Sequence, residues 1–165
     1  MTIELVEGYR PGAIGAVTAL HGRYYAESWK FGLFFEAKVA TELSAFLSRY
    51  DLETDRLWLA TRGSDIVGSL VIDGADPASP EPGAHLRWFI LDASCRGHGL
   101  GQQLMRRATG FCDARGVART YLTTFAGLDA ARKLYETHGF RLVSEGRDET
   151  WGVPVTEQLF ERVPG

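Results

Sequence analysis

The sequence has few of the features that mark several large classes of protein. It contains only two cysteines, Cys95 and Cys112, with neither the spacing of a zinc site nor the density of a disulfide scaffold. No stretch approaches the roughly 18 consecutive apolar residues of a membrane-spanning helix, and the acidic start of the chain lacks the pattern of a signal peptide. We therefore expect free thiols, no membrane partner and a cytoplasmic location.

An excess of positive charge is also lacking. The chain has 18 Lys and Arg residues against 21 Asp and Glu residues, and its basic residues are scattered. Because nucleic-acid-binding domains concentrate basic side chains on one face, we expect no nucleic-acid partner. Hydrophobic residues make up 45% of the 165 residues, which suits one packed domain spanning residues 1–165.

Local patterns predict alternating helices and strands. Helical periodicity runs from Ile14 to Tyr25 and from Phe35 to Leu47. Further helices are predicted at residues 100–115 and 129–138, and strands at residues 3–6, 56–61, 66–72, 85–91, 120–125, 140–144 and 153–160, with Gly146 and Asp148 between the last two. The order β-α-α-β-β-β-α-β-α-β-β indicates a mixed α/β domain in which helices flank one sheet.

A glycine-rich segment joins a predicted strand to a predicted helix. It reads Arg96, Gly97, His98, Gly99, Leu100, Gly101, Gln102. Glycines let the backbone turn tightly and bring its N–H groups close to a ligand, and the start of a helix adds partial positive charge. With the Arg96 guanidinium nearby, this segment is suited to the phosphate oxygens of a pyrophosphate.

Two other phosphate-binding loops fit this segment poorly. An ATP-binding P-loop needs Gly-Lys-Ser/Thr, but Gly101 is followed by two glutamines. A dinucleotide-binding loop has another glycine spacing and follows the first strand of its unit. No second ligand is spaced to join His98, so we predict that this residue offers a backbone N–H and an exposed ring, and that there is no metal site.

Two segments resemble the GNAT superfamily of acetyltransferases. Residues 91–104 are similar to its Arg/Gln-x-x-Gly-x-Gly/Ala signature, and residues 131–140 resemble its Ala-x-x-Leu-Tyr-x-x-x-Gly-Phe element. The resemblance extends from the predicted hairpin to the end of the chain and more loosely over the first two helices. Leu128 stands where many members carry Asn, so that contact to the pantetheine arm is not implied here.

The start of the chain has a second, weaker likeness. Residues 9–15, with Leu20, His21, Gly22 and Tyr25, resemble the acetyltransferase half of bacterial MarR-acetyltransferase fusion proteins. No separate DNA-binding domain fits in this chain. This likeness leaves the acceptor of the acetyl group open.

The resemblance to the superfamily implies a mixed, mostly antiparallel sheet of about seven strands and acetyl-CoA as cosubstrate. It implies that the strand holding Phe89, Ile90 and Leu91 splays from the next strand, so that its backbone N–H groups hold the pantetheine, while residues 96–102 hold the pyrophosphate. Tyr135 matches the tyrosine that the family often uses near the sulfur of coenzyme A, where a phenol can protonate a departing thiolate. Packing in the core is the alternative role for Tyr135.

Two residues are candidates for the base that deprotonates the amine. His85 lies eleven residues before Arg96, near where a histone-modifying branch of the family carries a catalytic Glu, and can relay a proton through water. Glu36 lies in the early helices, which usually shape the acceptor pocket in this family. The residues Tyr24, Tyr25, Trp29 and Phe34 are candidates to line that pocket. The alternatives are an ordinary strand histidine, a solvated glutamate and aromatic core residues.

The expected activity is acetyl-CoA-dependent N-acetyl transfer to a primary amine of a small molecule or peptide, by direct attack on the thioester. The alternative is a sensor or regulatory module that binds acyl-CoA without turnover. Trp151 and Phe160 either join a partner subunit in a homodimer or cover the core. The identity of the acceptor is left open by the sequence.

Overall fold

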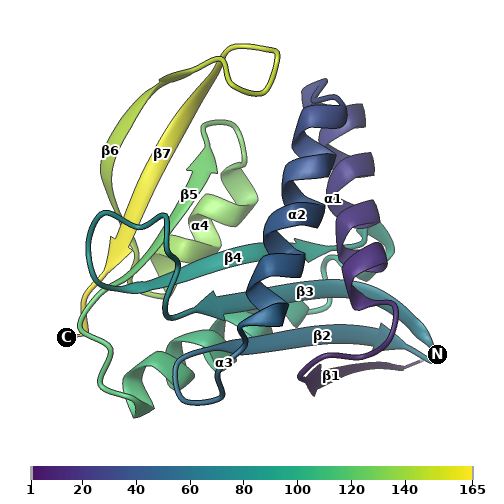
Figure 1. Cartoon of the computed structure of the whole chain (residues 1–165), viewed down its shortest axis with the longest axis vertical. Helices are drawn as coiled ribbons and strands as arrows, with labels where there is room; N and C mark the ends of the chain where they lie inside the picture. The colour runs from purple at the N-terminus through teal and green to yellow at the C-terminus, as the bar shows by residue number, and fades with distance from the viewer. Residues whose placement is uncertain (1, 165) are drawn as a thin grey trace.

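The computed structural model describes residues 2–164, and its centre is one seven-stranded sheet with helices on both faces (Figure 1). The elements are β1 (Ile3–Glu7), α1 (Ala13–Trp29), α2 (Leu33–Ser48), β2 (Arg56–Arg62), β3 (Asp65–Asp73), β4 (Ala84–Leu91), the short 3-10 helix η1 (Ala93–Cys95), α3 (Leu100–Ala114), β5 (Thr120–Phe125), α4 (Asp129–Thr137), β6 (Arg141–Asp148) and β7 (Val155–Arg162). The predicted order of helices and strands is confirmed.

The strands lie in the order β1-β2-β3-β4-β5-β7-β6. All neighbouring pairs are antiparallel except β4 and β5, which run parallel. The mixed, mostly antiparallel sheet is therefore as expected. Because β7 inserts between β5 and β6, residues near the end of the chain lie next to β5, one strand away from β4.

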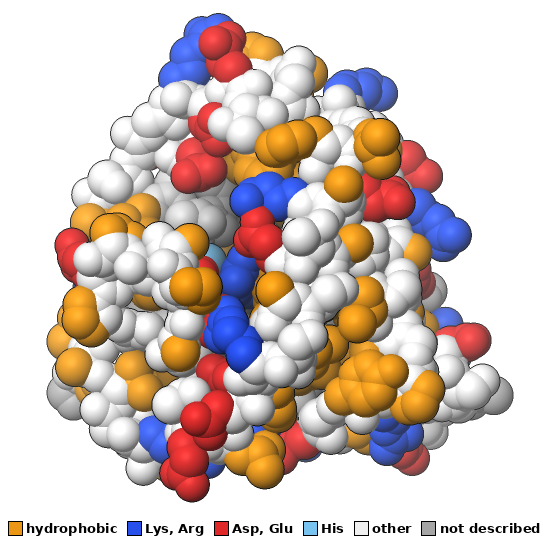
Figure 2. Space-filling view, in the orientation of Figure 1, with side chains coloured by type: hydrophobic (Ala, Val, Ile, Leu, Met, Phe, Trp, Pro, Cys, Tyr) orange, Lys and Arg blue, Asp and Glu red, His pale blue; other side chains and the backbone are white. Residues whose placement is uncertain are grey.

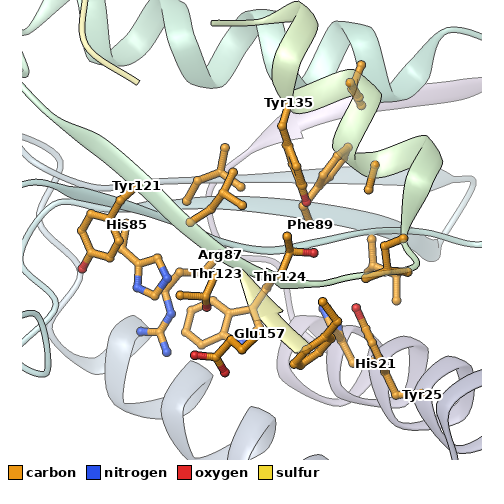
Figure 3. Close-up of a pocket in the computed structure, with 18 of the residues that line it drawn as sticks. His21, Tyr25, His85, Arg87, Phe89, Tyr121, Thr123, Thr124, Tyr135 and Glu157 are labelled. Carbon is orange, nitrogen blue, oxygen red and sulfur yellow. The ribbon is translucent and has the colours of Figure 1, made fainter. Parts of the chain in front are cut away.

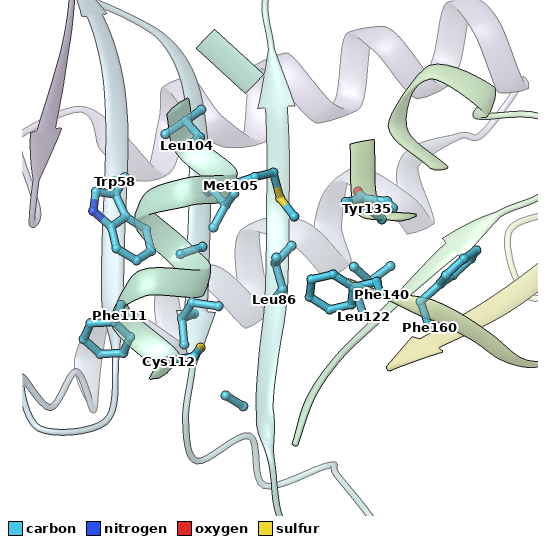
Figure 4. Close-up of a cluster of buried hydrophobic side chains, with 14 residues drawn as sticks. Trp58, Leu86, Leu104, Met105, Phe111, Cys112, Leu122, Tyr135, Phe140 and Phe160 are labelled. Carbon is cyan, nitrogen blue, oxygen red and sulfur yellow. The ribbon is translucent and has the colours of Figure 1, made fainter. Parts of the chain in front are cut away.

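Alternation along the strands divides the core into two layers. Leu57 and Leu59 of β2 face α1 and α2, whereas Trp58 between them faces α3. The layer under α3 and α4 is built from large buried side chains, among them Leu104, Met105, Leu122, Phe140 and Phe160 (Figure 4). Phe160 is therefore a core residue. Cys95 and Cys112 are buried and free, as predicted.

The end of the β6–β7 hairpin is placed differently from the prediction. Gly146 and Asp148 lie within β6, and the turn follows them, with Gly152 at a φ of 91°. The side chain of Asp148 accepts a hydrogen bond from the backbone N–H of Thr150 at 2.9 Å, a local bond typical of turns. The sequence-based boundary was wrong because an exposed strand tolerates Gly and Asp, which elsewhere indicate a turn.

The turn of this hairpin lies beside the N-terminal end of α2 (Figure 1). Trp151 packs there on Phe31 and Phe35, with ring centroids 5.8 and 5.4 Å apart. This aromatic contact fixes the hairpin against the helical layer. Within residues 2–164, no helix is both long and apolar enough to cross a membrane.

Candidate active site

A cleft opens where the two parallel strands separate. Within residues 2–164, β4 and β5 are paired only at Ala84 with Thr120 and at His85 with Tyr121. Beyond these pairs the strands diverge, and a cleft of about 1190 Å³ extends along the gap (Figure 3). The splayed strand that the sequence analysis expected is present, and one edge of β4 is left without a strand partner.

A bulge in β4 accompanies the separation. Val71 of β3 pairs with Arg87, but Ser69 pairs with Ile90, so β4 has one extra residue in this stretch. Trp88 lies in the bulge and has a φ of +47°. Its carbonyl accepts a 2.6 Å hydrogen bond from the Ser69 hydroxyl. Its ring packs on Phe46 of α2. These contacts hold a backbone shape that an aromatic residue rarely adopts.

The glycine-rich loop at one end of the cleft carries a run of backbone N–H groups without hydrogen-bond partners among the described residues. Gly97 and Gly99 have φ values of 80° and 75°, which glycine adopts without strain. Within residues 2–164, the backbone N–H groups of residues 97–102 donate no hydrogen bond to another residue, and Gly99 caps α3 without a side-chain bond. Free N–H groups at a helix start bind anions, so the loop fits a pyrophosphate.

Gly101 is needed for the loop to lie close to its neighbours. A Cβ at this position would come within 3.1 Å of Leu134 and 3.6 Å of the Phe89 ring. The start of α3 therefore packs directly against α4 and β4. His98 is exposed, and no group of three potential metal ligands occurs within residues 2–164.

Arg96 lies at the mouth of the cleft. Its guanidinium donates to the Leu91 carbonyl at 3.2 and 3.3 Å and lies over the Tyr24 ring, 5.2 Å from the centroid. These contacts use only part of its fork of donors. Arg96 is exposed and is in position to offer its remaining N–H groups to an anion on the loop.

Tyr135 reaches the middle of the cleft from α4. Its ring packs against Phe89, Phe140 and Phe160, and the residue is 7% exposed. Its hydroxyl hydrogen-bonds to no side chain or backbone group within residues 2–164 and faces the opening in Figure 3. Burial raises the pKa of Tyr135 above its ordinary value, so the phenol keeps its proton near neutral pH.

Comparison with known proteins gives the family. The family model described as "Acetyltransferase (GNAT) family" matches residues 16–140. The chain belongs to this family. Residues 16–140 therefore form an acetyltransferase domain of the GNAT type.

Individual relatives agree with this assignment. The chain is 30% identical over 129 residues to an N-acetylaspartate synthetase from Danio rerio, covering 78% of this chain and 45% of that protein's length. A GNAT acetyltransferase from Staphylococcus aureus has a TM-score of 0.74 at 17% identity, covering 98% and 99% of the two chains. A ribosomal-protein-alanine N-acetyltransferase from Brucella melitensis has a TM-score of 0.72 at 15% identity, covering 96% and 99%. At sequence identities of 17% and 15%, the similarity to these two structures shows a shared fold.

The cleft of this GNAT domain continues past the loop into a polar groove. In Figure 2, basic and acidic side chains gather in the hollow beside α2. Arg87 of β4 pairs there with Glu42 of α2 and donates to Asp73 at 3.2 Å, and its guanidinium lies over Trp88. Lys38 pairs with the same Glu42. The charges in this groove largely neutralise one another.

His85 lines the far part of this groove. Its Nδ1 donates to the Asp76 carboxylate at 2.8 Å, since a carboxylate only accepts, which leaves Nε2 as an acceptor. Burial, the largest cause, lowers the pKa of His85, and its bond to Asp76 opposes that change. Asp76 was missed by the sequence analysis because it lies in the loop before β4, nine residues from its partner.

The predicted acceptor-side residues divide into two groups. Tyr24 and Tyr25 line the cleft, as does His85. Trp29, Phe34 and Glu36 do not. Trp29 packs in the aromatic cluster that contains Trp151. Phe34 is exposed and touches only the Trp151 ring among these aromatics. Glu36 is exposed, with its carboxylate over Gly22 of α1.

Of the loop and strand residues predicted to hold the cosubstrate, most line the cleft. These are Phe89, Ile90, Leu91, Arg96, Gly97, Gly99, Gly101 and Gln102. His98 and Leu100 fall outside it, the first exposed and the second packed in the core. Leu128, at the position where many members carry Asn, lines the cleft as the residue before α4. A further lining residue, Glu157 of β7, had no signal in the sequence because its position depends on the strand order.

Proposed function

We propose that the chain binds acetyl-CoA with its pyrophosphate on residues 96–102 and its pantetheine arm along the open edge of β4. One observation carries this proposal: free backbone N–H groups at the start of α3 lie at the end of the gap between β4 and β5. The loop supplies donors for phosphate oxygens, and the unpaired edge of β4 supplies donors for amide groups. Both parts line the same cleft.

Bound acetyl-CoA supplies a thioester carbonyl that an amine can attack directly. The open edge of β4 offers preorganised N–H donors for the oxygen of that carbonyl, and one such donor lowers a barrier by about 3 kcal/mol. Tyr135 keeps its proton because burial raises the pKa of its phenol, and its hydroxyl opens on the cleft. Its position and its retained proton support a role in protonating the departing thiolate.

The acceptor in this proposal is a primary amine of a small molecule or peptide, held in the groove between α2 and the sheet. The relative from Danio rerio is named for N-acetylaspartate, which supports a small-molecule acceptor, although this chain spans under half of that protein. A module that binds acyl-CoA without turnover is the alternative. The free hydroxyl of Tyr135 favours the enzyme, because packing alone would not require it.

Calorimetric titration with acetyl-CoA tests the proposal. The wild-type protein should bind, and both Arg96→Ala and Gly99→Glu should weaken binding at least tenfold, since each removes or repels phosphate contacts. The matched control is Gly110→Glu, at an exposed glycine of α3 with open space around it. No binding by folded wild-type protein would refute the proposal, and equal losses in the control would mean that the loop is not responsible.

Other predictions from the sequence belong to the same proposal. We retain a single domain over residues 1–165, a cytoplasmic location and the absence of nucleic-acid and membrane partners, and leave the choice between a monomer and a homodimer open. The likeness of residues 9–15 to the acetyltransferase half of MarR-acetyltransferase fusion proteins does not identify the acceptor of the acetyl group. Size measurement by light scattering tests the dimer.

A further inference from the structure

Glu157 lies beside the place where β4 and β5 have separated. β5 pairs with β7 so that Phe125 is opposite Glu157. Phe125 follows Tyr121 by four residues, and His85 and Tyr121 are in register. Because the bulge adds one residue to β4, four residues of β3 separate the partners of His85 and Ile90. The pairing therefore brings Glu157 to the level of Ile90, next to Phe89, whose ring contacts that of Tyr135.

The side chain of Glu157 enters the cleft. It alternates with the buried Gln158 and shares its face of the sheet with Thr123 and Leu159, which also line the opening. In Figure 3, Tyr135 and Glu157 lie on opposite sides of the opening, with Thr123 and Thr124 between them. A carboxylate and a phenol thus line one cleft, as a reaction with one proton acceptor and one proton donor requires.

Two charged side chains act on the Glu157 carboxyl. Asp148 of β6 lies within hydrogen-bonding reach of it, and Lys38 of α2, which itself pairs with Glu42, adds a positive charge. Within residues 2–164 no ion pair engages Glu157. Burial, and then the charge of Asp148, raise the pKa of Glu157, while Lys38 lowers it. Trp151, packed on Phe31 and Phe35, fixes the hairpin that carries it.

His85 is less well placed for the same task. Asp73 pairs with His85 and Ser69 with Ile90, so four residues of β3 span the distance between them. At about 3.3 Å per residue, His85 lies about 13 Å along the sheet from Ile90. A proton relay from the splayed edge to His85 would need several waters.

We propose that Glu157 binds the ammonium of the acceptor and takes its proton, an inference that rests on the proposed function. The ammonium gives one proton to the Glu157 carboxylate, and the freed nitrogen forms the C–N bond to the acetyl carbon as the C–S bond breaks. The sulfur takes the hydroxyl proton of Tyr135. The second proton on nitrogen returns to the Tyr135 oxygen through water, so the products are the N-acetylated amine and the free thiol.

The test compares Glu157→Gln with wild-type protein in thiol-release assays with acetyl-CoA. The amine probes are ethylamine, putrescine, L-aspartate and L-lysine. We expect kcat to fall at least 100-fold while acetyl-CoA affinity stays within twofold, because loss of a general base costs about 10² to 10⁴ in rate. The acid limb of the kcat/KM profile should disappear. The control is Glu145→Gln, on the opposite face of the same hairpin, paired with Gln158.

Each outcome decides a separate point. Turnover by Glu157→Gln within fivefold of wild type would overturn the inference, and an increase in KM alone would overturn the proton transfer. If Glu157→Gln does not fold, Glu157→Asp should retain part of the activity and the acid limb. Failure of wild-type protein to bind acetyl-CoA would instead refute the proposed function.

A second measurement does not depend on finding the true acceptor. The Glu157 carboxyl carbon is followed by NMR in the protein with coenzyme A, while ethylammonium chloride is added. A saturable shift that Glu145 does not show is expected, and ethanol should produce none. If the chemical shift of the Glu157 carboxyl carbon did not change on addition of ethylammonium, the inference would be overturned.

Discussion

His85 and Tyr121 face each other across the parallel step of the sheet, and their rings stack with centroids 4.5 Å apart. Towards the start of α3, no further pairing between β4 and β5 occurs within residues 2–164. The stacked pair therefore marks the closed end of the cleft, and Asp76 fixes the orientation of the imidazole. A residue at this end is suited to recognise the part of the acceptor that is remote from the amine.

The first prediction concerns this pair. His85→Gln and Asp76→Asn should raise the KM for the acceptor about tenfold and leave kcat within threefold, since a hydrogen bond to a polar group of the substrate is lost at a distance from the reacting atoms. Steady-state kinetics with varied amine measure both constants. If both variants instead turned over about a hundredfold more slowly, as loss of a general base predicts, the proton transfer would belong to His85 and the role of Glu157 would be contradicted.

The second prediction concerns Tyr135. Tyr135→Phe should lower kcat about 100-fold with unchanged acetyl-CoA affinity, because the ring remains and only the proton donor is removed. Its stability should be close to that of wild type, since the hydroxyl bonds to no residue in the described part of the chain. Thiol-release kinetics, calorimetry and thermal unfolding provide the three measurements. Tyr9→Phe, at an exposed position, is the control; full activity of Tyr135→Phe would favour core packing as its role.

The parts of the site that sequence reasoning found are contiguous in the chain. Residues 96–102 could be recognised as a phosphate-binding loop from a short stretch of sequence, because the glycine spacing, the preceding strand and the following helix are all local features. Tyr135 was found in the same way, through a motif of ten residues. Helices and strands were likewise predicted from local periodicity, with errors mainly at the exposed end of β6.

The parts that it missed depend on pairing between distant segments. Glu157 enters the cleft because β7 inserts beside β5, and no local pattern indicates that strand order. Asp76 meets His85 because the loop before β4 folds back. Trp29 was predicted to line the pocket, but it packs in an aromatic cluster that the hairpin turn completes with Trp151. Phe34 was also predicted there, but it lies exposed outside the cleft, with its ring on Trp151.

The third prediction concerns the two charged neighbours that shift the pKa of Glu157 in opposite directions. Asp148 and Lys38 are the charged groups that act on this carboxyl, from β6 and α2, and Lys38 lowers its pKa. Lys38→Met should therefore raise that pKa further and shift the acid limb of kcat/KM to higher pH, whereas Asp148→Asn should shift it to lower pH. Profiles of kcat/KM for both variants measure the shift. If the acid limb of kcat/KM stayed at the same pH in both variants, a group other than Glu157 would be responsible for that limb.

The fourth prediction concerns stability at low pH and His21, which is buried in α1 with its Nδ1 2.8 Å from the Val17 carbonyl oxygen. Burial lowers the pKa of His21 from 6.5 to about 4. Between these values the unfolded chain binds a proton that the folded protein excludes, so the free energy of unfolding falls as pH decreases from 6.5 towards 4. The full difference corresponds to about 3 kcal/mol.

The variant His21→Leu isolates this contribution, because leucine fills a buried site without titrating. Urea unfolding at about pH 7.5 and about pH 4.5 gives the free energy of unfolding of both proteins. Wild type should lose about 2 to 3 kcal/mol more than the variant over this range, since carboxylates and the other histidines titrate in both and cancel in the comparison. Equal losses would mean that His21 becomes protonated in the folded protein, and the helix would then have to open around it.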